Sequence, residues 1–203
     1  MTRAEDGIRA RRDLLTKAVS AFAARGFPGV SIASLADELG IAKATVLHHY
    51  PSKERLYDEV LSEIARTLEP LMVMASAQRE PNARSLAEIA CGYLKWARAN
   101  PDCAKLLTRE LLDNAERASE AKRWHLREFT KSLTALIDRG QALGTLREFE
   151  SALFVEMLLG LVQFHIAANA TRPHLMNKTK AKTYERALEQ QLQEMVVKGF
   201  SSS

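Results

Sequence analysis

The apolar positions along this chain recur every three or four residues, which is the period of an amphipathic α-helix. No segment combines sustained apolar–polar alternation with enrichment in β-branched residues, as a half-buried strand would. The pattern therefore predicts an all-α protein. Helices are expected at about residues 8–25, 32–39, 43–50, 53–75, 84–99, 101–112, 116–143, 150–170 and 177–198.

Glycine and proline set several of the predicted helix ends. Gly144 follows the last apolar position of the helix at 116–143, where a glycine favours the left-handed conformation that closes a helix. Gly199 is expected to end the last helix. Pro70 lies inside the segment 53–75, and the sequence leaves open whether it kinks or ends that helix.

Residues 31–50 predict two short helices joined by a tight turn. Ser31 is placed to cap the first helix, and Gly40 stands where the chain must turn. The second helix is expected to end near residue 50, because Pro51 cannot continue it. This is the geometry that places a helix in the major groove of DNA. An ordinary αα-hairpin inside a helical core is the alternative.

The second helix of the pair carries polar groups on its exposed face. Lys43 can reach a phosphate or a guanine, and Thr45 can contact a phosphate or a thymine methyl group. His48 and His49 can donate hydrogen bonds to phosphates. Each residue alone is equally well explained as a solvated surface group, but their grouping on one face favours DNA contact. Adjacent histidines point about 100° apart on a helix, so no metal site is expected there.

Composition narrows the class of protein. The chain has 203 residues, of which 46% are hydrophobic and 27% charged, as in globular proteins. A net charge of +4 permits nucleic-acid binding without demonstrating it. Cys91 and Cys103 form no CxxC pair, and the charged N-terminus lacks the apolar core of a signal peptide. We therefore expect reduced thiols and a cytoplasmic protein.

Other functional classes find little support in the sequence. The most apolar segment, residues 152–170, contains Glu156, Gln163 and His165, so a membrane partner is not expected. No glycine-rich phosphate loop, GxSxG motif or HExxH motif occurs, so we expect neither an enzyme nor a cofactor.

The segment 14–61 resembles the N-terminal domain of TetR-type transcriptional regulators. The resemblance is carried by AFAARGF at 21–27, SIASLADELGI at 31–41 and KATVLHHYPSKERL at 43–56. It implies a helix-turn-helix DNA-binding domain at residues 1–52. A larger C-terminal helical bundle at residues 53–203 would bind an effector and dimerise, with the helix 53–75 as connector.

The resemblance also implies roles for the residues that match the family motif. DNA contacts are implied at Ser31, Lys43, Ala44, Thr45, His48, His49, Tyr50 and Lys53. Three positions depart from the family pattern, which often has serine at Ala42, glycine at Ala44 and an aromatic residue at Leu47. These departures remove a hydroxyl group and one aromatic phosphate contact.

The C-terminal part offers candidates for an effector pocket and a dimer interface. Aromatic and polar residues there fit a small-molecule site, although each also fits core packing. The pocket candidates are Tyr93, Trp96, Leu107, Arg109, His125, Phe129, Met157, Gln163 and Phe164. Periodic apolar positions in the last two helices predict a homodimer interface, unless the chain's own core uses them. The interface candidates are Phe154, Leu158, Leu161, Val162, His165, Tyr184, Leu188, Leu192 and Met195.

The sequence thus predicts a ligand-responsive regulator, usually a repressor in this family. It would bind a palindromic double-stranded DNA operator as a homodimer and be released by a small-molecule effector. Two alternatives stay open. One is a DNA-binding protein that is gated by a protein partner or has no small ligand. The other is a helical interaction module or enzyme that binds no DNA.

Overall fold

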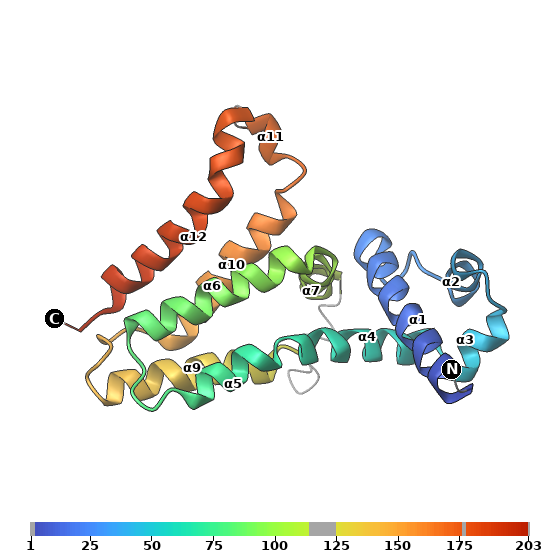
Figure 1. Ribbon diagram of the computed structural model, residues 1–203, viewed down its shortest axis with the longest axis horizontal. Coiled ribbons are helices and arrows are strands. Elements are labelled where there is room, and N and C mark those ends of the chain that lie inside the picture. The colour runs from blue at the N-terminus through green and yellow to red at the C-terminus, as the bar shows by residue number, and fades with distance from the viewer. Residues whose placement is uncertain (1–2, 114–124, 176–177, 203) are drawn as a thin grey trace. The chain divides into compact units, whose positions relative to one another are not determined.

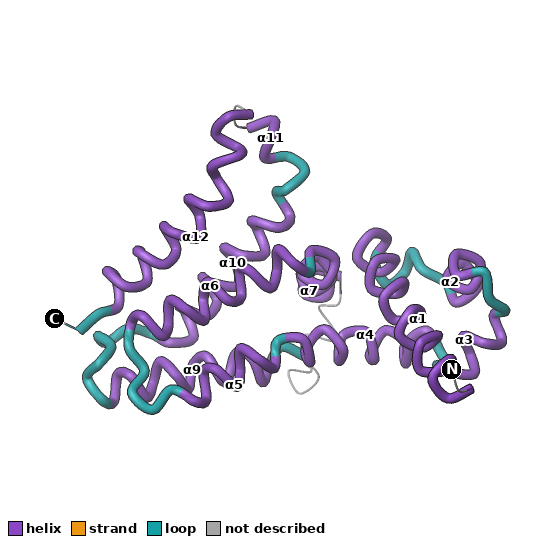
Figure 2. The backbone as a smooth tube through the Cα atoms, in the orientation of Figure 1, coloured by secondary structure: helices purple, strands orange, loops and turns teal. Residues whose placement is uncertain are grey.

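The computed structural model describes residues 3–113, 125–175 and 178–202, and most of these are helical (Figure 2). No strand occurs in these ranges, where Leu146 and Ser201 form an isolated bridge. The prediction of an all-α fold is therefore confirmed. Within the same ranges, no helix has both the length and the apolar character that crossing a bilayer requires.

The packing divides the chain into two units. The first unit comprises Met1–Arg66 with Asp102–His125, and the second comprises Thr67–Pro101 with Leu126–Ser203. The helix that follows the helix-turn-helix segment thus belongs to the first unit almost to its end. The expected division of function between residues 1–52 and 53–203 stays a prediction.

The first unit contains α1 (Arg3–Arg25), α2 (Ile32–Leu39) and α3 (Lys43–His49), with nearly all of α4 (Lys53–Thr67) and α7 (Pro101–Asp113) (Figure 1). Its core forms around Tyr57 of α4, whose ring lies 4.9 Å, centroid to centroid, from the rings of both Phe22 and Phe27. The Tyr57 hydroxyl donates to Glu110 of α7 at 2.5 Å. One aromatic residue therefore joins α1, α4 and α7.

Polar contacts from α7 also hold α1. The Arg109 guanidinium donates to the backbone oxygens of Ala23 and Ala24, at 2.9 and 3.1 Å, in the last turn of α1. Carbonyls at a helix C-terminus lack intrahelical partners, so a cation there is favourable. Ser20 donates to Asp102 at 2.8 Å. These contacts join α7, though distant in sequence, to α1 within the first unit.

Local chemistry closes the turn between α2 and α3 as predicted. The Ser31 hydroxyl accepts from the Ser34 backbone at 3.0 Å, and the Ser34 hydroxyl accepts from the Ser31 backbone at 3.1 Å, which together cap α2. At the other end Gly40 has φ = 66°, in the left-handed region. The Ile41 N–H then donates to the Ala36 carbonyl at 3.0 Å. The chain leaves α2 in a fixed direction.

Pro70 ends the predicted helix at 53–75 and begins another. α4 stops at Thr67, and α5 (Glu69–Ala77) starts with Pro70 in its first turn. Proline has no N–H to donate to the carbonyl of Arg66, and its ring would clash with that carbonyl in a continuous helix. The break at Leu68 lies beside the boundary between the two units.

The second unit contains α5, α6 (Ala83–Ala99), α9 (Arg127–Ala142), α10 (Ser151–Ala167), α11 (Arg172–Leu175) and α12 (Lys178–Phe200). α6 packs against α5, α10 and α12, and most of its side chains are buried. Lys95 of α6 pairs with Glu189 of α12 at 2.9 Å. α9 packs against α5 and α10, and Arg139 donates to the Ala75 carbonyl of α5 at 2.9 Å.

Several predicted helix bounds were wrong, among them the start of the first helix, which was expected near residue 8 and lies at Arg3. The helix expected at 116–143 does not run through residues 125 and 126, which form a turn before α9 begins at Arg127. The chain passes there from the first unit to the second. The expected start of that helix, residues 116–124, lies outside the described residues, as does residue 177. Gly144, at φ = 67°, follows the end of α9 as predicted.

Gly199 does not end the last helix, which continues to Phe200. The Phe200 ring lies 4.3 Å, centroid to centroid, from Phe149 and 4.9 Å from Phe154. Packing of Phe200 against Phe149 and Phe154 therefore overrides the weak helix preference of Gly199.

We expect the substitution Gly40→Ala to lower the free energy of unfolding by about 1–2 kcal/mol, since an L-residue is strained in the left-handed region. A Cβ at Gly40 meets nothing within 4 Å, so the cost is one of backbone conformation alone. The matched control is Gly7→Ala in α1, where a Cβ also meets nothing within 4 Å. Urea unfolding should show the control unchanged or more stable. Equal stability of the two variants contradicts the account of the turn.

Candidate functional site

α3 is held to the first unit by two side chains. Of its seven residues only Val46 is buried, and His49 is half-buried. Tyr50, the C-terminal cap residue, is 4% exposed, and its backbone N–H donates to the Val46 carbonyl at 2.9 Å. Ala44 and His48 each lie two positions from Val46, about 200° around the helix. They therefore occupy the side of α3 that faces away from the core.

The outward side of α3 carries the predicted polar groups. Lys43, Thr45 and His48 are exposed, and Ala44 lies between them with no bulky side chain. The His48 and His49 rings lie 5.6 Å apart, centroid to centroid. A cation, a hydroxyl and an imidazole beside a small residue match what base edges and phosphates accept.

Two other predicted DNA residues have structural roles. The Ser31 hydroxyl caps α2, yet the residue is exposed, and a hydroxyl that accepts one hydrogen bond can still donate another. The Lys53 ammonium lies 4.2 Å from the centroid of the Phe27 ring, in a cation–π contact. Both remain compatible with phosphate contact at the surface.

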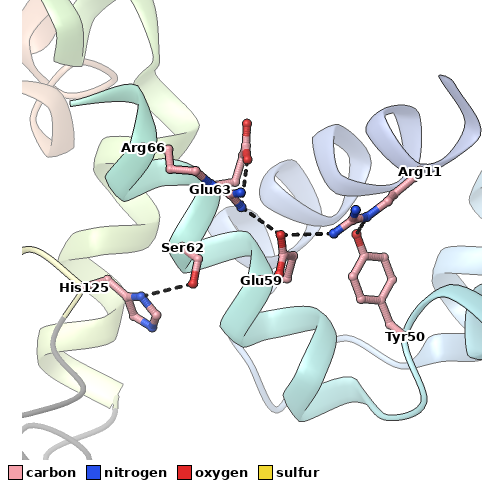
Figure 3. A network of polar contacts seen from close by, with 7 residues as sticks. All are labelled: Arg11, Tyr50, Glu59, Ser62, Glu63, Arg66 and His125. Carbon is pink, nitrogen blue, oxygen red and sulfur yellow. Dashed lines mark hydrogen bonds and ion pairs between the residues drawn. The ribbon is translucent and has the colours of Figure 1, made fainter. Parts of the chain in front are cut away.

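The structure revises the prediction for Tyr50. Its ring is buried, and its hydroxyl accepts from Arg11 Nε at 3.0 Å (Figure 3). A phenol that is buried and already bonded has no surface to offer a phosphate, so Tyr50 is an anchor for α3. The sequence signal was ambiguous, because a tyrosine beside exposed histidines fits a surface position as well as a buried one.

Comparison with known proteins places this arrangement in a family. Residues 14–60 match the family described as "Bacterial regulatory proteins, tetR family". Residues 83–199, more than half of the chain, match "Tetracyclin repressor-like, C-terminal domain". The chain belongs to the TetR family of bacterial regulatory proteins. The resemblance of segment 14–61 is confirmed.

Individual TetR-family relatives are similar over much of the chain. The HTH-type transcriptional regulator RutR of Escherichia coli K12 is 30% identical over 66% of this chain, which spans 59% of RutR. The ketosteroid regulator KstR2 of Mycobacterium tuberculosis has the same fold, with a TM-score of 0.71 and 19% identity over 96% of each chain. FadR of Bacillus subtilis, solved with stearoyl-CoA, has a TM-score of 0.72 at 16% identity, over 93% of this chain and 98% of FadR.

Four of the predicted effector residues come together in the second unit. The Tyr93 ring lies 5.5 Å from Trp96 and 5.2 Å from Phe129, between centroids. Gln163 of α10 donates to the Tyr93 hydroxyl at 2.9 Å, and both residues are buried. Burial raises the pKa of the Tyr93 phenol above its ordinary value, although the Gln163 hydrogen bond acts in the opposite direction. We call these four residues the aromatic cluster.

The other five effector candidates do not join this cluster. Leu107, Arg109 and His125 belong to the first unit, where Arg109 caps α1. His125 Nε2 lies 3.2 Å from Asp58, and its Nδ1 lies 3.4 Å from the Ser62 hydroxyl (Figure 3). Met157 and Phe164 are 63% and 75% exposed on α10. The assignment of these five residues to an effector site stays a prediction.

The predicted interface on α10 and α12 is also partly revised. Five of its nine members are buried in the chain's own core and have no surface to offer a partner: Phe154, Leu158, Val162, His165 and Leu192. Leu161, Tyr184 and Leu188 are half-buried, and Met195 is exposed. The exposed apolar surface of α10 consists instead of Leu153, Met157 and Phe164. The period was visible in the sequence, but apolar residues occur on every side of α10, so the pattern did not show which side is buried.

We expect the stability of the protein to depend on Tyr93 above about pH 10, where an unfolded tyrosine ionises. The folded chain retains the Tyr93 proton while the unfolded chain releases it, so stability is full below that pH and is lost as the pH rises. Tyr93→Phe should show a shallower loss, by up to about 1.4 kcal/mol per pH unit. Urea unfolding between pH 8 and 11 measures this. Parallel pH profiles for the two proteins contradict it.

Proposed function

We propose that this chain is a ligand-responsive transcriptional regulator, acting as a repressor, that binds a palindromic DNA operator as a homodimer. The observation that carries the proposal is the exposure of α3. A seven-residue helix that buries only Val46, follows a capped helix and a left-handed turn, and displays a lysine, a threonine and two histidines is suited to the major groove.

In this proposal the outward side of α3 reads the operator. Lys43 at the start of the helix donates to a phosphate or to guanine, and Thr45 contacts a phosphate or a thymine methyl group. Ala44 and His48, opposite Val46, face the floor of the groove, where the small Ala44 allows the helix backbone to approach. Ser31 and Lys53 contact the phosphates on either side.

The homodimer would form through the exposed apolar side of α10. Leu153, Met157 and Phe164 recur at helical spacing, and Met195 of α12 is also exposed. Two copies related by a twofold axis bury such a patch against itself. The two α3 helices would then enter successive major grooves, about 34–36 Å apart.

The effector would bind at the aromatic cluster of the second unit. Three aromatic rings and an amide from α6, α9 and α10 suit an apolar molecule that carries a hydrogen-bonding group. A ligand that prefers one arrangement of these helices shifts the dimer toward the state with mispositioned α3 helices, by its difference in affinity for the two states. The interruption between α4 and α5 at Leu68 is a candidate hinge.

The test of DNA binding uses duplexes selected by the wild-type protein from a pool with a randomised centre. Lys43→Ala and Thr45→Ala should each weaken binding to the selected duplex by about 1–3 kcal/mol if the side chain reads a base. Fluorescence anisotropy at several salt concentrations measures the affinity, which should fall steeply with added salt.

The matched control for this test is Lys131→Ala on α9, which removes an exposed lysine from the second unit. Lys131 pairs with Glu128 at 3.2 Å, and we expect its variant to bind like the wild type. Recovery of no duplex by the wild type, or equal loss of affinity in the α3 variants and the control, contradicts the proposal.

The dimer surface is tested with Phe164→Glu, which places a charge in the apolar patch and should shift the protein to monomers. Leu112→Glu is the matched control, because Leu112 is likewise 75% exposed but lies on α7. Sedimentation velocity at micromolar concentration should show a dimer for the wild type and the control. A dimer that survives Phe164→Glu contradicts the assignment of the surface.

A further inference from the structure

The side chains of α3 itself make very few contacts that could fix the orientation of this helix. Its N-terminal cap residue, Ala42, makes no side-chain capping bond, and Val46 is its only fully buried residue. A helix that enters a groove must hold its side chains to within about 0.5 Å of their partners. Tyr50, which directly follows α3 and is buried, is therefore the residue through which its C-terminal end can be positioned.

Arg11 of α1 connects Tyr50 to α4 (Figure 3). Its Nε donates to the Tyr50 hydroxyl at 3.0 Å, and its Nη2 donates to Glu59 of α4 at 3.2 Å. The Arg11 guanidinium carbon also lies 5.8 Å from the centroid of the Tyr50 ring. A planar guanidinium can serve two acceptors at once with fixed geometry, which a lysine ammonium on a flexible stem does less well.

Glu59 is itself held in place along α4. It accepts from Arg66 at 2.7 Å, and Arg66 also pairs with Glu63 at 3.0 Å. The carboxylate that receives Arg11 therefore lies between two guanidinium groups (Figure 3). Tyr50, Arg11, Glu59 and Arg66 form a continuous series of contacts, which we call the Arg11 relay.

We propose that Arg11 is a positioning residue for DNA recognition, which holds the C-terminal end of α3 against α4 by joining Tyr50 to Glu59. This inference rests on the proposed DNA-binding function. It assigns to Arg11 a role through the protein and not through a contact with the duplex. The relay adds no base contact, but it reduces the range of orientations that α3 must give up on binding.

The competing explanation is that Arg11 binds a phosphate directly, since its side chain is 52% exposed. The two explanations predict opposite signs for substitutions that change charge. If charge alone matters, Tyr50→Phe has no effect and Glu59→Ala strengthens binding, because a negative charge near DNA is removed. If positioning matters, Arg11→Ala, Tyr50→Phe and Glu59→Ala all weaken binding.

The experiment measures the affinity of these variants for the duplex selected by the wild-type protein, at several salt concentrations. We expect Tyr50→Phe and Arg11→Ala each to weaken binding by about three- to tenfold per operator half-site, which is the size of one typical intramolecular hydrogen bond. The double variant should bind no more weakly than Arg11→Ala alone, because both remove one contact. The slope of log affinity against log salt should stay that of the wild type.

Glu63→Ala is the matched control for Glu59→Ala. Both substitutions remove one carboxylate from α4, but only Glu59 contacts Arg11. We expect Glu63→Ala to bind as tightly as the wild type or more tightly, and Glu59→Ala to bind more weakly. Helical content by circular dichroism, and melting curves recorded without DNA, confirm that each variant is folded. Tyr50→Phe keeps the buried ring and tests the inference even if Arg11→Ala is unstable.

The outcomes separate this inference from the proposed function. Failure of the wild type to select any duplex overturns both. Normal wild-type binding with unchanged Tyr50→Phe binding overturns the relay and leaves the function standing. A salt slope reduced by about 0.9 for each subunit's Arg11, or about 1.8 for the dimer, together with tighter binding by Glu59→Ala, shows a direct phosphate contact and also overturns the relay.

Discussion

The attachment of α3 by Val46 and Tyr50 is the constraint on which this account depends. A helix of two turns cannot be stable alone, since helices shorter than about 12 residues are marginal in water. α3 therefore exists because the turn at Gly40 delivers it and because two side chains bind it to the first unit. With so little surface used for attachment, nearly all the rest is available for a partner. The exposure of α3 and its weak attachment to the first unit therefore have the same cause, which is that it buries few side chains.

Three other helices of the first unit, α1, α4 and α7, are held together by contacts outside α3. Tyr57 joins α1 and α4 through its ring and α7 through its hydroxyl, and Arg109 caps the end of α1. Aromatic packing and hydrogen bonds to charged groups thus hold α1, α4 and α7 together. Both are among the stronger contacts in proteins. The Arg11 relay connects α1 and α4 to α3, which buries only one of its own side chains.

Local chemistry could be predicted from the sequence, and tertiary placement could not. The cap at Ser31, the turn at Gly40 and the close of α9 near Gly144 depend on residues within a few positions of each other, and all were predicted. The role of Tyr50 depends on Arg11, which is 39 residues away. The end of α12 depends on Phe149, because Phe200 packs against Phe149 and the helix continues through Gly199. Such contacts leave no periodic signal in a single chain.

In the candidate sites too, residues whose exposure follows from local sequence were predicted, and residues whose burial depends on tertiary packing were not. The outward residues of α3 were predicted, because a seven-residue helix with one buried position has a clear polar face. The burial of the candidate residues on α10 was only partly predicted, because apolar residues occur on all sides of this helix and their period does not say which side the core takes. The structure puts Phe154 inside and Phe164 outside, and tertiary packing, which includes the contacts of Phe154 with Phe149 and Phe200, decides between them.

The position of α3 on DNA is tested by dimethyl sulfate protection on the selected duplex, because this reagent methylates guanine N7 in the major groove and adenine N3 in the minor groove. If α3 lies in the major groove, bound protein protects guanine N7 in two patches about 10 base pairs apart and leaves adenine N3 reactive between them. Protection confined to adenine N3, or a bound complex with no protected guanine in a G-containing site, would contradict the claim that α3 lies in the major groove.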